Sequence, residues 1–144
     1  MAVSGSRFTL LCISTAGLAL IITLLVPRTS AQPTAPTDNK GFKATAMQAV
    51  DLGPEIEGMS GRQLRMRTLT IEPGGYIGMH SHKDRPIVVY FLKGTDTVTF
   101  ADGTVKVFRA GDSSFANKDT THWHRNDGKD PVVLIAVDVF HNAK

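Results

Sequence analysis

The feature that most constrains the fold of this chain is a series of short strand-forming runs, each ended by turn residues. Strands at intervals of about 8–12 residues, without intervening helices, predict an all-β sandwich or barrel. Nowhere in the chain beyond the first 41 residues do apolar residues recur at helical spacing over three turns. The hairpin signal Asp102-Gly103 separates two of the runs. The runs lie at residues 87–92, 97–100, 104–108 and 132–140.

Two segments carry more detailed expectations. Residues 87–92 (IVVYFL) are β-branched, aromatic or aliphatic throughout, which favours a strand buried on both faces. Residues 64–71 (LRMRTLTI) change the phase of their apolar–polar alternation halfway along. A bulge or bend near Thr68 would explain this change, and Arg65 and Arg67 are expected on the solvated side of the strand.

The N-terminal part is typical of an export signal. Residues 8–26 (FTLLCISTAGLALIITLLV) are apolar apart from Ser, Thr and Gly, and Pro27 ends the run. Small residues then precede Gln32, as a signal peptidase requires. We therefore predict that residues 1–31 are a signal peptide. The alternative is an uncleaved membrane anchor, because about 20 apolar residues can span a bilayer.

With residues 1–31 assigned to export, the remainder divides into two parts. Residues 32–41 (QPTAPTDNKG) are rich in Pro, Thr and Ala and predict a flexible linker. Residues 42–144 form the expected folded domain, in a periplasmic or secreted location, with membrane contact only if the anchor stays uncleaved. Cys12, the only cysteine, lies in the apolar segment, so the folded domain has neither a disulfide nor a cysteine nucleophile.

The charge of the folded part excludes one class of partner. After Arg7 and Arg28 are set aside with the export segment, 14 basic and 13 acidic residues remain. No basic run is interleaved with aromatic residues. A nucleic-acid-binding surface is therefore not expected.

Four of the five histidines form two His-x-His pairs, in MHSHKDRPI at residues 79–87 and in THWHRN at residues 121–126. Residues i and i+2 of a strand point to the same face. Imidazole is a good ligand for Zn, Fe, Cu and Ni. Two such strands that meet inside a barrel would bring three or four ligands together. The alternative is that these histidines serve as half-polar strand residues without a metal.

These segments resemble the two motifs of the cupin superfamily, and in particular small single-domain cupins of the quercetin-dioxygenase-like kind. The resemblance covers roughly residues 60–140. It implies a double-stranded β-helix, that is, a jelly-roll barrel. The matching motifs are Gly74-x5-His80-x-His82-x4-Ile87-x6-Gly94 and Gly111-x5-Asn117-x4-His122-x3-Asn126.

The resemblance implies that His80, His82 and His122 are metal ligands and that Asn126 has a structural hydrogen-bonding role. Two positions depart from the family pattern. The glutamate of the first motif is replaced by Ile87, which cannot coordinate a metal, and the Pro-x-Gly of the second reads Asn-Lys-Asp at 117–119. A three-histidine site remains, as some cupin dioxygenases use.

Two residues are candidates to replace the missing glutamate. Asp84 shares the parity of His80 and His82, but it lies in a predicted turn and is expected to face solvent. His124 shares a face with His122. It is our candidate catalytic residue, as a general base, although it could also be a fourth ligand, a hydrogen-bonding partner of a ligand or a buried structural histidine.

The function implied by the resemblance is that of a metal-dependent enzyme, dioxygenase-like or isomerase-like, acting on a small molecule through the three-histidine site, and the N-terminal segment implies that it is exported. Its cofactor would be a divalent transition metal: Fe, Mn, Ni, Cu or Zn. A module that binds a ligand or a metal without turnover is the alternative, and a metal-free structural barrel is the third reading. The resemblance also implies a homodimer.

Overall fold

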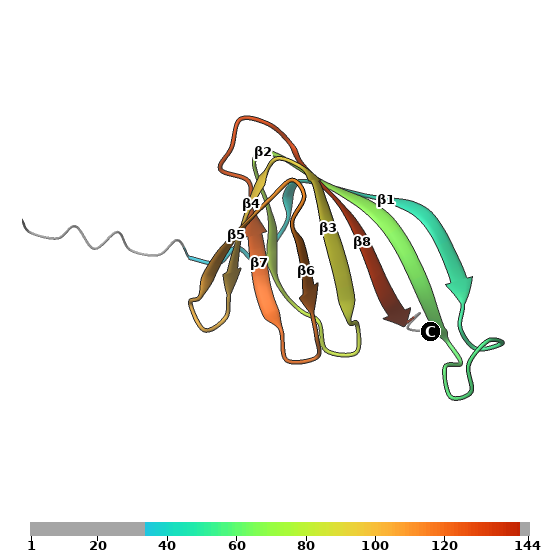
Figure 1. Ribbon diagram of the computed structural model, residues 1–144. Helices are drawn as coiled ribbons and strands as arrows, with labels where there is room; N and C mark the ends of the chain where they lie inside the picture. The colour runs from blue at the N-terminus through green and yellow to red at the C-terminus, as the bar shows by residue number, and fades with distance from the viewer. Residues whose placement is uncertain (1–33, 142–144) are drawn as a thin grey trace, which may run out of the picture. The chain divides into compact units, whose positions relative to one another are not determined.

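The computed structural model describes residues 34–141, and this part consists of eight β-strands without any helix (Figure 1). It therefore has no helix long and apolar enough to cross a membrane. The predicted signal peptide lies outside the described residues. The strands are β1 (Lys40–Asp51), β2 (Arg62–Ser81), β3 (Ile87–Lys93), β4 (Thr95–Phe100), β5 (Val105–Arg109), β6 (Ser113–Ala116), β7 (Thr121–Arg125) and β8 (Val132–His141).

The strands form one antiparallel sheet that is folded on itself about β2. The strand order is β5-β4-β7-β2-β8-β3-β6, and β1 pairs with the free side of β2. The first half of β2 pairs with β8 and β1, whereas its last residues pair with β7. Figure 1 shows β4, β5 and β7 on one side and β3, β8 and β1 on the other. The predicted all-β jelly roll is confirmed.

The apolar core lies between the two halves of the sheet. Leu69 and Ile71 of β2 pair with Leu134 and Val132 of β8, and all four side chains are buried. Phe91 of β3 stacks on Phe108 of β5, with ring centroids 5.1 Å apart. Because these two rings come from opposite halves of the sheet, their contact closes the barrel.

The expected hairpin of β4 and β5 is present, and Gly94 allows the tight turn that precedes it. The segment between β4 and β5 turns at Asp102-Gly103, where the amide of Gly103 donates to the carbonyl of Phe100 over 2.9 Å. Gly94, between β3 and β4, has a φ of 82°. A Cβ at this position would lie 2.6 Å from the carbonyl oxygen of Pro131. Only glycine therefore allows β4 to start so close to β8.

The expected bulge in β2 is wrong. β2 pairs with β8 without interruption from Arg62 to Ile71, and the nearby irregularity falls in β1 between Ala46 and Gln48. The phase changes because Arg65 and Arg67 point to the same side as the buried apolar residues that follow them. They are not solvated there: both donate to the buried carboxylate of Asp138.

The expectation that β3 is buried on both faces is also wrong. Its inward side chains Ile87 and Phe91 are buried, but Val88, Tyr90 and Leu92 are 57%, 49% and 48% exposed. The outer face of β3 is apolar without being covered by any described residue. Apolar content alone therefore did not distinguish a half-buried strand from a fully buried one.

Residues 34–41, the described part of the predicted linker, are attached to β2. The side-chain oxygen of Asn39 accepts from the amide of Gly78 over 2.9 Å. The carbonyl of Pro36 accepts from the amide of Met79 over 2.7 Å. Lys40 already belongs to β1. This segment thus holds the part of β2 that leads into the first His-x-His pair.

Candidate metal centre

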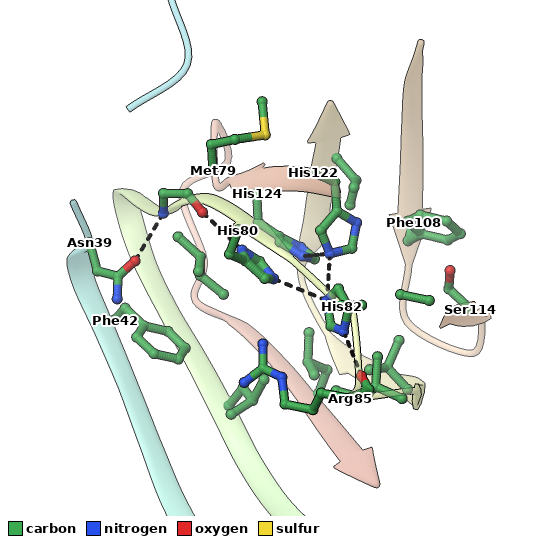
Figure 2. A pocket seen from close by; sticks show the side chains of 18 of the residues that line it. Asn39, Phe42, Met79, His80, His82, Arg85, Phe108, Ser114, His122 and His124 are labelled. Carbon is green, nitrogen blue, oxygen red and sulfur yellow. Dashed lines mark hydrogen bonds between the residues drawn. The ribbon is translucent and has the colours of Figure 1, made fainter. Parts of the chain in front are cut away.

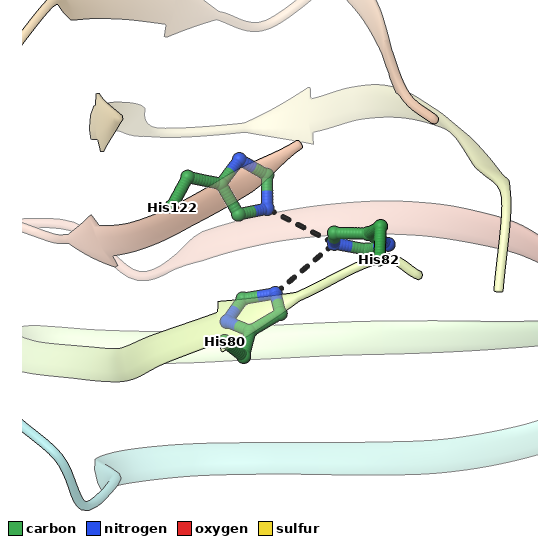
Figure 3. A group of neighbouring side chains, drawn as sticks. All are labelled: His80, His82 and His122. Carbon is green, nitrogen blue, oxygen red and sulfur yellow. Dashed lines mark hydrogen bonds between the residues drawn. The ribbon is translucent and has the colours of Figure 1, made fainter. Parts of the chain in front are cut away.

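The two His-x-His pairs lie side by side in the barrel. His80 belongs to the end of β2, His82 follows that strand, and His122 and His124 belong to β7. His80 and His122 are cross-strand partners in the β2–β7 ladder. His82 and His122 are buried, whereas His80 and His124 are half-buried. Figure 3 shows the rings of His80, His82 and His122 turned toward one another.

The ring nitrogens that converge are the Nε2 atoms. Nε2 of His82 lies 3.1 Å from Nε2 of His80 and 3.0 Å from Nε2 of His122. Nε2 of His124 lies 3.4 Å from that of His122. His80, His82 and His122 each offer a ligand atom within 4.8 Å of the other two. The pairing of β2 with β7, together with the turn that follows β2, therefore brings three candidate ligands to one point.

The tautomers of two rings are fixed by the backbone. Nδ1 of His80 lies 2.9 Å from the carbonyl oxygen of Gly78, and Nδ1 of His82 lies 3.1 Å from that of Arg85. A carbonyl oxygen can only accept, so both Nδ1 atoms carry the hydrogen. In a neutral imidazole the Nε2 atom then holds a lone pair. Two lone pairs thus face each other at 3.1 Å, an arrangement that a shared cation would stabilise.

A proton does not fill this role near neutral pH. Burial lowers the pKa of His80 to about 4 and that of His122 to about 2. Burial also lowers the pKa of His82. The three rings are therefore neutral at pH 7, which is the form that coordinates metals.

The spacing of the Nε2 atoms fits a divalent transition metal. Nitrogen ligands about 2.0–2.1 Å from an ion lie about 3.0 Å apart at right angles and about 3.4 Å apart in a tetrahedron. The observed separations of 3.0 and 3.1 Å match the first value. The carbonyl contacts to Nδ1 are the outer contacts that usually orient histidine ligands.

His124 is held by a carboxylate that the sequence analysis missed. Its Nδ1 donates to Oδ2 of Asp96 over 2.7 Å, and Asp96 is completely buried. The lone pair of His124 Nε2 therefore points toward His122. The sequence contained the signal, because Asp96 lies two residues before the apolar Val98 in β4, so the two side chains share the inward face.

Ile87 lies inside the barrel, whereas Asp84 lies on its surface. Ile87 is buried and lines the cavity beside the histidines, so an apolar side chain stands where the family has a carboxylate. Asp84 is exposed in the turn after β2, with a φ of 60°, and does not belong to the histidine cluster. Among the described residues, the cluster contains no carboxylate ligand.

Asn126 has the structural position that was expected of it. Its side chain is fully buried, and Nδ2 donates to the carbonyls of Ile71 and Asp130 over 2.8 and 2.9 Å. Its Oδ1 accepts from the amide of Gly128 over 2.9 Å. Asn126 thus ties the loop after β7 to β2 and takes no part in the cluster.

A cavity of about 380 Å³ opens beside the cluster, and all four histidines line it. Most of the remaining wall is apolar, with Phe42, Ile77 and Phe108 among its side chains. Arg67 and Arg85 also line it, and the sequence analysis assigned neither to a site. Figure 2 shows the labelled residues around this space, with Arg85 below the histidines.

Comparison with known proteins gives one family and several solved structures of the same fold. The sequence profile of the cupin domain matches residues 67–138, half of the chain and the part that contains all four histidines. No curated protein sequence matches the chain.

Solved structures share the fold at low identity. The Cnp3 cupin domain of Schizosaccharomyces pombe has a TM-score of 0.55 at 14% identity, over 69% of this chain and 65% of that one. An uncharacterized double-stranded β-helix protein of Klebsiella pneumoniae has a TM-score of 0.58 at 18% identity, over 76% and 86%. The polyketide cyclase RemF of Streptomyces resistomycificus has a TM-score of 0.57 at 14% identity, over 72% and 68%. These similarities show the architecture alone.

Proposed function

The chain belongs to the cupin family, and from that premise we propose that it is an exported enzyme with one divalent transition metal at His80, His82 and His122. The observation that carries this proposal is the facing of two fixed Nε2 lone pairs at 3.1 Å. We propose a dioxygenase-like or isomerase-like reaction on a small molecule. The metal, when bound, supplies Lewis-acid chemistry and, if it is Fe, Mn or Cu, redox chemistry.

His124 is the residue that we assign to proton transfer. Its Nε2 carries a lone pair that points into the cluster, 3.4 Å from Nε2 of His122, because Nδ1 donates to Asp96. It can therefore take a proton from a substrate at Nε2, and the buried carboxylate of Asp96 stabilises the resulting imidazolium. Ile87 offers no proton acceptor at the position where the family has a glutamate, so this role falls to His124.

The test compares the wild type with His124→Phe, which keeps the size of the ring and removes its nitrogens. Both proteins are loaded with metal and screened against small enolic and aromatic carbonyl compounds for oxygen uptake and for exchange of carbon-bound hydrogen in D2O. We expect the variant to keep its metal and to lose about 10²–10⁴-fold in turnover, the usual range for general acid–base catalysis. Unchanged turnover would exclude His124 as the base.

A binding module without turnover is the second candidate, and Ile87 is the observation that favours it. Replacement of a metal-binding carboxylate by a buried aliphatic side chain removes an anionic ligand that catalysis in the family uses. If the metal-loaded wild type shows neither oxygen uptake nor hydrogen exchange across the screen, this candidate replaces the enzyme.

We also propose a homodimer, which light scattering tests directly.

A further inference from the structure

We propose that the cavity beside the histidine cluster binds a small molecule that carries a carboxylate on an apolar body, and that Arg67 and Arg85 hold the carboxylate. This inference rests on the proposed function, since it names the substrate class of the same site. It is derived from the charges of the cavity wall, whereas the metal centre is derived from the histidine nitrogens.

The wall of the cavity holds two permanent cations and no anion. Arg67 and Arg85 line it, and no aspartate or glutamate is among its described lining residues. A metal at the cluster would add further positive charge. The cavity therefore favours an anionic ligand.

Arg67 is only partly neutralised by its neighbour. Its Nη2 donates to Oδ2 of Asp138 over 2.9 Å, but Asp138 also accepts two hydrogen bonds from Arg65, at 3.1 and 2.9 Å. One carboxylate thus serves two guanidinium groups. Nε of Arg67 is buried without a partner among the described residues, and Nη1 donates to none of them. Burial lowers the pKa of Arg67, which reflects this incomplete compensation.

Arg85 combines a fixed backbone with a side chain that lacks a partner. Its carbonyl accepts from Nδ1 of His82 and its amide donates to the carbonyl of His82 over 2.9 Å. The residue is half-buried, and its guanidinium forms no ion pair or hydrogen bond with residues 34–141. Figure 2 shows this side chain extending below His80 and His82.

A carboxylate matches both the charge and the geometry of these groups. Guanidinium groups bind carboxylates through paired, charge-assisted hydrogen bonds. A cation that is partly removed from water without an opposite charge is unfavourable, and a bound anion relieves this cost. Arg85, which lacks a partner, and Arg67, which shares one carboxylate with Arg65, are therefore both suited to bind the carboxylate of a ligand.

The rest of the cavity selects the body of the ligand. A volume of about 380 Å³ is at the lower end of the range of about 300–1,000 Å³ for small-molecule sites. Phe42, Phe91 and Phe108 belong to its wall, so an aromatic or branched aliphatic group would replace water there favourably. A ligand anchored by the arginines shares this cavity with the Nε2 atoms of the cluster.

The experiment uses the full chain, expressed with its own N-terminal segment, both after treatment with a chelator and after loading with Zn²⁺. Calorimetry measures the binding of benzoate, phenylacetate and 3-phenylpropanoate, of the three corresponding amides, and of phenyl phosphate. Arg85→Met is the main variant because it leaves the Arg65–Asp138 pair and the backbone contacts of residue 85 intact. Arg67→Met is the second variant, and Arg109→Met is the control, since Arg109 is exposed and does not line the cavity.

We expect at least one carboxylate to bind about tenfold or more tightly than its amide in the chelated wild type, as charge-assisted hydrogen bonds predict. Arg85→Met and Arg67→Met should each reduce this preference several-fold and leave amide binding unchanged, whereas Arg109→Met should keep it. Equal binding of carboxylates and amides, no binding of any of the three carboxylates, or an undiminished preference in both variants would overturn the proposal. Tighter binding of phenyl phosphate than of every carboxylate would overturn it as well.

The design separates this inference from the proposed function. Metal content is measured in every protein. If Zn²⁺ binds and no carboxylate preference is found, the inference fails and the metal centre stands. If no metal binds, the proposed function fails, and the preference in the chelated protein still decides the role of the arginines.

Discussion

At the scale of single residues, the hydrogen-bonding capacity of backbone carbonyls determines what the histidine cluster can do. Gly78 and Arg85 each present a carbonyl oxygen to an Nδ1 atom, and so turn a lone pair of His80 and of His82 toward the same point. Gly78 itself is held through its amide by Asn39. The orientation of the candidate ligands thus depends on residues that do not touch the metal position.

The lowered pKa values of these histidines predict how the metal-free protein responds to acid. Burial lowers the pKa of His80 to about 4 and of His122 to about 2, from about 6.5 in the unfolded chain. Below pH 6.5 the unfolded state therefore binds more protons than the folded state. The contribution of the neutral rings to the free energy of unfolding is fully present above pH 6.5. It is lost as the pH falls toward 4 and then 2.

We expect the free energy of unfolding of the chelated protein to fall by roughly 1–3 kcal/mol per pH unit between pH 6 and 5. Each ring contributes up to about 1.4 kcal/mol per pH unit to this slope. Urea denaturation at several pH values measures this slope. His80→Gln should reduce it, and His141→Ala, at an exposed position outside the cluster, should not. A flat profile from pH 7 to 5 would contradict the assignment of buried neutral rings.

The candidate ligands were predictable from the sequence because residues two apart on a strand share a face, which is a local property. Asp96 was missed although the same rule applies to it, since a single aspartate in TDTVTF resembles a solvated strand residue. Its role depends on His124, which lies 28 residues later in the chain. A pattern within one strand cannot predict this hydrogen bond, because its two residues come from β4 and β7.

At the scale of strands, β2 shows how an inward-facing charge can imitate a bulge. The alternation of apolar residues shifts at Thr68, but the backbone stays regular against β8. The two arginines face inward because Asp138 of β8 lies directly across from Arg65. A pattern based on hydrophobicity treats arginine as outward-facing, so it assigned the wrong face to half of the strand.

This arrangement makes Asp138 important for stability. Asp138→Ala leaves Arg65 and Arg67, whose side chains are only 19% and 15% exposed, without a counter-charge. We expect the free energy of unfolding to fall by about 3–5 kcal/mol, the usual cost of breaking a buried ion pair by removing one partner. Urea denaturation of the chelated protein measures this change.

The matched control for that substitution is Asp130→Ala. Asp130 pairs with Lys93 at 3.7 Å, and both side chains are largely exposed. Exposed pairs contribute only about 0–1 kcal/mol, so this variant should stay close to the wild type. Equal losses in the two variants would show that the Asp138 cluster has no special role.

At the scale of the whole molecule, the jelly roll was predictable because it is encoded by many weak local signals that agree. Turn residues marked the ends of strands, and the two motifs placed both His-x-His pairs at corresponding positions of the barrel. The charge of the cavity was not predictable in the same way. Arg67 lies within β2 and Arg85 in the turn between β2 and β3, and only the folded chain brings the two to one cavity.

The export of the protein is a prediction at this scale. We expect the mature chain to begin at Gln32, because Thr29-Ser30-Ala31 provides the small residues before a cleavage site. The measurement is the intact mass and N-terminal sequence of the protein recovered from the periplasmic and membrane fractions of the expressing cell. An uncleaved chain in the membrane fraction would support the anchor, and an uncleaved chain in the cytoplasm would contradict export.

The central claim is that His80, His82 and His122 bind a divalent transition metal, and the most direct measurement is the metal content of the purified protein by mass spectrometry. The wild type is compared with the double variant His80→Ala/His82→Ala and with the control His141→Ala, which alters the one histidine outside the two pairs. The account predicts about one transition-metal ion per chain in the wild type and the control, and none in the double variant. No metal in the wild type after reconstitution, or equal metal in all three proteins, would contradict it.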